Sequence, residues 1–230
     1  MMTAGFYEQL KVPHEAATCY TSAAKMLKKV DVKGSIVPLE KAATTYAKTS
    51  KFNFASKYSM EIAEILENDV ADLDAAMAMY EQASDYAQMD GQAGSQLSKC
   101  NSKVARLAAV LEKYDRAIEL FEEIADAYVE NDLLKFSCKE FYLKAGLCTL
   151  CAGDVEGAKI KVERYEDRAA YFRDSRESKL LKDVSGAVEN EDADLFTEII
   201  REYDAVSKLD SWMTQILLKI KKQASSDDLL

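Results

Sequence analysis

Residues 76–83, AMAMYEQA, place an alanine, a tyrosine four positions later and a second alanine three positions after that. Related segments are AATCYTSA at 16–23, AATTYAKT at 42–49 and AIELFEEI at 117–124. This spacing gathers the side chains on one helix face, where a small residue admits a neighbouring helix and the ring fills the next gap. Segment starts 34 and 41 positions apart are typical of repeated helical hairpins.

The rest of the chain also favours helices. It has 230 residues but only 2 prolines and 8 glycines, too few turn residues for a sheet protein. Helical periodicity predicts α-helices over residues 14–30, 35–49, 53–68, 73–89, 114–129, 133–152, 155–168, 174–190 and 192–207. A further helix follows the loop 90–94 and ends near 112, a terminal helix is capped by Asp210, and residues 1–11 resemble the second half of a helix.

We therefore predict an all-α fold, a tetratricopeptide-like right-handed superhelix of antiparallel helical hairpins with a C-terminal helical cap. The repeat fades after Asp154, which suggests a hairpin array over 1–152, a cap over 153–223 and an acidic-leucine tail over 224–230. Leu209, Trp212, Met213, Ile216, Leu217 and Ile220 form one apolar stripe that the terminal helix would bury.

Charge and cysteine usage limit the possible partners and compartments. The net charge of −10 argues against nucleic acid as a ligand, because binding to phosphates depends on Lys and Arg. Five cysteines without framework spacing favour a reducing compartment. No apolar run is long enough to span a bilayer, and the start lacks signal-peptide features, so a cytoplasmic location is expected.

The sequence offers little that could perform chemistry. Its one histidine, His14, lacks the second ligand that a zinc site or proton relay would need. Cys148 and Cys151 have redox-type spacing, but they lie among leucines in a predicted helix and are expected to be buried thiols. We predict no catalytic residue, no metal site, no cofactor and no enzymatic activity.

Several basic groups stand out in this acidic chain. Lys99, Lys103 and Arg106 recur at helical spacing and predict an uncompensated cationic stripe. Other basic groups are Lys48 with Lys51 and Lys57, Lys135 with Lys139, and Arg173 with Arg176. Each group alone is explained by ordinary surface solubility. On a shared face they would bind an elongated acidic partner.

Five segments resemble soluble NSF attachment proteins of the α/β type, which include the yeast vesicle-transport counterpart. They are HEAATCY at 14–20, SMEIAEILENDVADLDAAMAMYEQASDYA at 59–87, LLKFSCKEFYLKAGLC at 133–148, DSRESKLLKDV at 174–184 and EYDAVSKLDSWMTQILLKIKK at 202–222. The resemblance covers essentially the whole chain, although the family's opening hairpins are missing. It implies an adaptor that binds the assembled SNARE four-helix bundle, of the kind that contains syntaxin, and recruits and stimulates an NSF-type AAA ATPase for SNARE disassembly. Membrane association would be peripheral, through the SNAREs.

The resemblance also assigns site residues. The positions that match SNARE-contacting residues are Lys51, Lys57, Lys99, Lys139 and Arg176, with Leu133 as an apolar contact, and the cationic stripe adds Lys103. The positions that match ATPase-contacting residues are Asp154, Glu189, Asp227, Asp228 and Leu229. Gly186 stands at one of the family's acidic positions, for which Glu191 would compensate.

One alternative function stays open from sequence. A generic tetratricopeptide-type scaffold for trafficking or complex assembly would bind a single extended peptide in its groove. Removing the SSDDLL tail would not affect such a scaffold, whereas it would disable an adaptor that uses Leu229.

Overall fold

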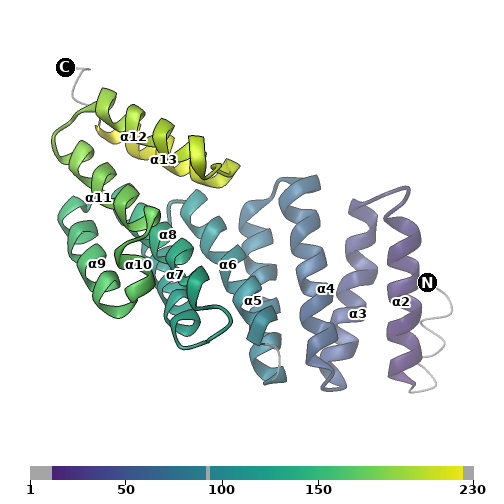
Figure 1. Ribbon diagram of the computed structural model, residues 1–230. Coiled ribbons are helices and arrows are strands. Elements are labelled where there is room, and N and C mark those ends of the chain that lie inside the picture. The colour runs from purple at the N-terminus through teal and green to yellow at the C-terminus, as the bar shows by residue number, and fades with distance from the viewer. Residues whose placement is uncertain (1–11, 92–93, 225–230) are drawn as a thin grey trace. The chain divides into compact units, whose positions relative to one another are not determined.

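The structure, a computed structural model, describes residues 12–91 and 94–224, and within them it contains α-helices and short 3₁₀ or π turns (Figure 1). The predicted all-α class is thereby confirmed. The helices are α2 (Pro13–Leu27), α3 (Ile36–Lys48), α4 (Phe52–Ile65), α5 (Leu73–Asp90), α6 (Gly94–Val110), α7 (Tyr114–Val129), α8 (Cys138–Cys151), α9 (Val155–Arg168), α10 (Ala170–Arg173), α11 (Arg176–Glu189), α12 (Ala193–Val206) and α13 (Ser211–Ala224).

The chain divides into two compact units after Val104, within α6. In the first unit, α2 packs on α3, α3 on α4 and α4 on α5, as consecutive antiparallel helices do when short connections join them (Figure 1). In the second unit, α7 packs on α8, α8 on α9, and α11 on α8, α9 and α12. The domain boundary predicted at residue 152 stays a prediction.

The repeat pattern accounts for the packing between helices. Its alanines, Ala16, Ala42, Ala76 and Ala117, are completely buried, and its rings, Tyr20, Tyr46, Tyr80 and Phe121, are at most 5% exposed. The third position of the repeat is buried in two of the four segments, at Ala83 and Ile124. In the other two segments, Ala23 and Thr49 are half-buried. Small residues and rings at these positions therefore build the core of both units, as the sequence predicts.

One turn geometry joins many of these helices. The residue just before the N-cap of the next helix has a positive φ: Ser50 (+56°), Ala71 (+61°), Glu112 (+62°), Gly153 (+83°) and Glu191 (+53°). After each of these residues the next backbone N–H donates back into the preceding helical segment: Lys51 to Tyr46, Asp72 to Leu66, Lys113 to Ala108, Asp154 to Thr149 and Asp192 to Ala187 (2.8–3.2 Å). Such turns satisfy the carbonyls at a helix end while reversing the chain.

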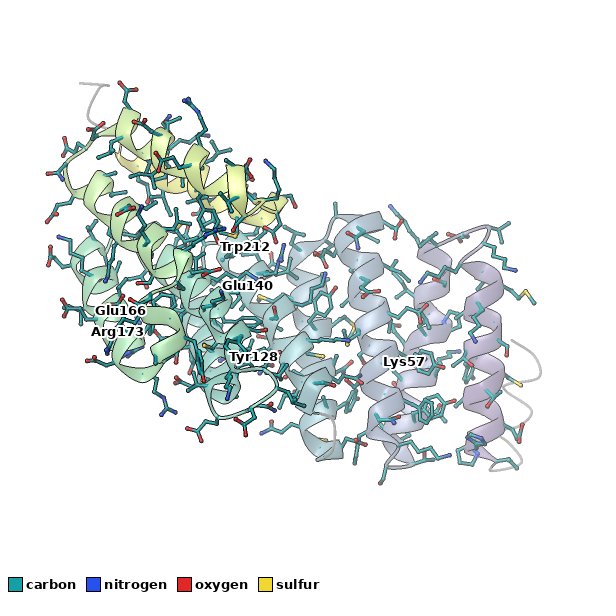
Figure 2. The ribbon with its side chains drawn as sticks, in the orientation of Figure 1. Lys57, Tyr128, Glu140, Glu166, Arg173 and Trp212 are labelled. Atoms are coloured by element: carbon teal, nitrogen blue, oxygen red, sulfur yellow. The ribbon has the colours of Figure 1, made fainter. Side chains whose placement is uncertain are left out.

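The terminal helix α13 packs against α8, α11 and α12 within the second unit. Its predicted apolar stripe is buried, with Leu209 half-buried. Asp210 accepts a hydrogen bond from Met213 N (2.7 Å), which confirms the predicted cap. Trp212 lies edge-on to Phe121 (ring centroids 5.6 Å apart), and its Nε1 donates to the Arg106 carbonyl (2.9 Å; Figure 2).

Several of the predicted helix boundaries are wrong. The helix expected over 133–152 begins only at Cys138, because the Asn131 side chain accepts from Leu133 N (2.9 Å) and a 3₁₀ turn, Lys135–Ser137, follows. The short helix α10 precedes α11 and was not predicted, and α11 starts at Arg176 because Ser175 caps it. The helix expected over 1–11 lies outside the described residues.

A polar contact ties α7 to α9. Glu122 Oε1 accepts from Lys161 Nζ (2.6 Å) and Tyr165 Oη and forms an ion pair with Arg164 (2.6 Å). Burial alone would raise the pKa of Glu122, but these three partners outweigh it and lower that pKa below its usual value. The ionised carboxylate therefore stabilises the folded second unit.

We expect Glu122→Gln to lower the free energy of unfolding at pH 7 by about 1–3 kcal/mol, because a charged acceptor is lost. Since the folded pKa lies below the unfolded one, the carboxylate's contribution is complete above about pH 5 and disappears as pH falls through the folded pKa. Urea unfolding at pH 7 and near pH 3.5 should show the difference between wild type and variant shrinking in acid. A difference that is constant with pH would contradict this assignment.

Candidate partner-binding surfaces

A groove in the first unit brings together two of the predicted SNARE-contacting lysines. Lys57 on α4 and Lys99 on α6 line it together with Lys28, which follows α2, and its volume is about 350 Å³ (Figure 2 shows Lys57). Glu61 and Glu64 also line this groove, and Glu61 is paired with Lys28 (2.9 Å). Among the described residues, Lys57 and Lys99 have no ion pair, and both side chains are exposed. Their charge is therefore available to an acidic partner.

The predicted uncompensated stripe is wrong at two of its three positions. Lys103 forms an ion pair with Glu67 (3.0 Å), whose carboxylate also accepts from Tyr80 Oη (2.8 Å). Arg106 forms an ion pair with Asp210 (2.9 Å) and lies over the Trp212 ring. Both partners are distant in sequence, so helical spacing alone could not reveal them.

Lys51 lies at the turn between α3 and α4, where it is the N-cap residue of α4. Its side chain is exposed, and Nζ lies 3.3 Å from His14 Nδ1. This contact gives the one histidine a structural neighbour in the first unit. Lys51 belongs to the same unit as Lys57 and Lys99, but it does not line their groove.

The predicted apolar contact, Leu133, lies in the second unit and is 91% exposed. Two aromatic residues that sequence analysis missed are exposed as well: Phe136, at 58%, and Tyr171, at 42%. Their rings contact each other (centroids 4.7 Å apart), and Lys135 Nζ lies over the Tyr171 ring. Leu133, Phe136 and Tyr171 therefore expose apolar side chains in this unit. The sequence signal for the two aromatic residues was the apolar residues flanking Lys135.

Lys139 and Arg176 also belong to the second unit, but they differ in their partners. Lys139 Nζ lies 3.5 Å from Glu177 Oε2, a buried carboxylate oxygen. Burial, reinforced by the Glu177 charge, raises the pKa of the adjacent Tyr203 to about 12. Arg176 is exposed at the start of α11 and lines a groove of about 180 Å³. Arg176 is thus the more available of the two cations.

The predicted ATPase-contacting acids of the described chain lie at helix ends in the second unit. Asp154 caps α9, accepting from Gly157 N (2.8 Å), and Glu189 at the end of α11 pairs with Lys159 on α9. Glu191 is exposed in the turn that follows. Open space surrounds Gly186, since a Cβ there would meet nothing within 4 Å. Asp227, Asp228 and Leu229 lie outside the described residues.

Candidate metal ligands and thiols are the groups of the described chain that chemistry would most readily use. Residues 12–91 and 94–224 contain no group of three or more His, Cys, Asp or Glu side chains that could hold a metal ion. Cys148 and Cys151 are buried free thiols, as predicted; burial raises the pKa of the Cys148 thiol well above its usual value and that of Cys151 to about 12. Within this part of the chain, no helix combines the length and apolar character that crossing a membrane requires.

The structure thus defines an all-α protein of helical hairpins with exposed cationic and apolar side chains. Sequence comparison gives its family: the family described as "Soluble NSF attachment protein, SNAP" matches residues 1–225. The chain belongs to the soluble NSF attachment protein family, as its resemblance to that family predicts.

Individual relatives agree with this assignment. The chain is 40% identical over 220 residues to the alpha-soluble NSF attachment protein of Homo sapiens, covering 96% of this chain and 74% of the human protein. It is 39% identical to the beta-soluble NSF attachment protein of Bos taurus, over 97% of this chain and 74% of the bovine protein. It is 37% identical to a probable vesicular-fusion protein sec17 homolog of Schizosaccharomyces pombe, over 94% of this chain and 75% of that protein.

Proposed function

We propose that this protein is an adaptor, not an enzyme, that attaches an NSF-type AAA ATPase to assembled SNARE complexes. In this role it stimulates the ATPase to disassemble them during vesicle fusion and intracellular transport. Membership of the soluble NSF attachment protein family carries the proposal. The names of the relatives support it, since they specify attachment to NSF and vesicular fusion. The protein would act in the cytoplasm and meet membranes peripherally, through SNAREs.

For the SNARE side, we assign the exposed cations Lys51, Lys57, Lys99 and Arg176 and the apolar group of Leu133, Phe136 and Tyr171. A net charge of −10 would repel an acidic SNARE bundle, so attraction must come from local positive charge. The exposed apolar group would add contact area that salt does not screen. Lys103 and Lys139 contribute less, because Glu67 and Glu177 already compensate them.

For the ATPase side, we assign Asp154, Glu189, Glu191, Asp227, Asp228 and Leu229. Asp154 has a structural task as well, so replacing it by alanine would remove both the charge and the helix cap. Asparagine at this position would keep the cap while removing the charge. Because Glu189 is paired with Lys159, the tail acids are expected to contribute more to attraction of the ATPase than Glu189 does.

The experiment that tests the SNARE side is co-sedimentation with assembled SNARE bundle at low and high salt. We expect the double variant Lys57→Glu and Lys99→Glu to bind about tenfold more weakly than wild type at low salt, because two unpaired cations of one groove become anions. The loss should shrink at high salt, where screening weakens the original attraction.

The matched control is Lys25→Glu with Lys33→Glu, which makes the same charge change at exposed lysines of the same unit outside this groove. An equal loss in the control would mean that net charge, and not the groove, governs binding. Binding by wild type that does not change with salt would contradict an electrostatic contact altogether. Binding to a single extended peptide in place of the bundle would indicate a generic peptide scaffold.

A further inference from the structure

A second apolar groove lies between α12 and α13, which run side by side in the second unit (Figure 1). Its volume is about 160 Å³, and Phe196 and Ile200 from α12 face Leu217 and Leu218 from α13 across it. Leu218 is 54% exposed. Leaving such a groove open to water is unfavourable, so it is suited to binding apolar side chains.

The groove has a positive charge at one end. Lys221 lines it one turn before the end of α13, and its Nζ donates to Thr197 Oγ1 (2.6 Å), another residue that lines the groove. An occupant that combines apolar side chains with neighbouring carboxylates would match both features.

The chain's own residues 225–230, SSDDLL, have this chemistry: two aspartates followed by two leucines. They follow directly on α13, which ends at Ala224. Leu218 lies about 9 Å back along the helix axis from residue 224, given a rise of about 1.5 Å per residue. Six extended residues reach up to about 20 Å, so the tail can reverse direction and place its leucines at Leu218.

We propose that residues 225–230 fold back over α13 and place Leu229 and Leu230 in the groove between α12 and α13. Asp227 and Asp228 then lie beside Lys221, and the leucines are shielded from water. Insofar as Leu229 contacts the ATPase, which rests on the proposed function, the same residue cannot occupy both sites at once. The groove thereby holds the tail in the free adaptor, and the ATPase must displace it.

Disulfide trapping in the full chain tests this placement. Cys19 is replaced by serine, since the other four cysteines are buried, and Leu218→Cys is combined with Leu230→Cys. The control combines Gln215→Cys, an exposed position of the same helix that does not line the groove, with Leu230→Cys. With oxidised glutathione as oxidant, we expect the Leu218 pair to close at least about tenfold faster, because docking raises the local concentration of the tail thiol. Adding Asp227→Asn and Asp228→Asn should slow this closure.

Equal closure rates for the two pairs would overturn the proposal. Disulfide-linked dimers in place of an internal bridge would also overturn it, since they would assign the groove to a second copy. The bridged protein should fail to stimulate the ATPase and recover on reduction, with Leu229 unaltered throughout. A different result would separate the two proposals. If neither the bridged nor the reduced protein stimulates the ATPase, while the Leu218 pair still closes faster than the control pair, the docking of the tail is supported and the adaptor function is contradicted.

Discussion

Trp212→Ala is expected to lower the free energy of unfolding by about 3–5 kcal/mol, the usual cost of removing a buried aromatic side chain. Trp212 is 5% exposed, and its ring packs edge-on against Phe121 of α7. Its Nε1 hydrogen bond to the Arg106 carbonyl is lost as well. The loss should separate α13 from the end of α6 and from α7. Urea unfolding followed by far-UV circular dichroism measures the change.

The control for this variant is Leu218→Ala on the same helix. Leu218 is 54% exposed, so its truncation should cost clearly less than that of Trp212. Equal destabilisation by the two variants would mean that α13 contributes through helix formation alone. No destabilisation by Trp212→Ala would contradict the packing of the terminal helix described above.

Leu229→Ala is expected to remove most of the stimulation of the ATPase while leaving binding to the SNARE bundle largely intact. The proposed reason is that a leucine after two acids supplies the apolar centre of a contact whose charges attract the ATPase. Co-sedimentation with the bundle and phosphate release by the added ATPase measure the two properties separately.

Leu133→Ala serves as the matched control, because it also shortens one leucine, in this case a 91% exposed one on the proposed SNARE side. It should weaken binding to the bundle without altering the tail. Loss of both properties in Leu229→Ala would mean that the tail has a structural task. Unchanged ATPase stimulation would remove Leu229 from the proposed contact.

Sequence patterns predicted the helical core well because its determinants are local. The bounds of α7 and α9 were predicted to the residue, since Asp154 and the small and aromatic residues of the repeat lie within one or two turns of each other. The start of α8 was predicted five residues too early, at 133 instead of Cys138. Leu133 instead lies in a turn that the Asn131 side chain stabilises.

The candidate surfaces were predictable only in part, because pairing of charges is a long-range property. Periodicity identified Lys99, Lys103 and Arg106 as one stripe, yet the partner of Lys103 lies 36 positions away and that of Arg106 lies 104 positions away. Grooves depend on how separate helices meet, so the one that joins Lys57 to Lys99 could not be predicted from either segment alone.

The positive-φ turns restrict how the length of this chain can change. At Gly153 a single residue separates Ala152, at the end of α8, from Asp154, the cap of α9. One inserted residue would rotate the following helix by about 100° about its axis, because an α-helix turns once in 3.6 residues. The buried Ala158, Val162 and Tyr165 would then leave the interface. Substitutions in such turns should thus be tolerated more readily than insertions, whereas the longer connection from Glu130 to Ser137 offers room for added residues.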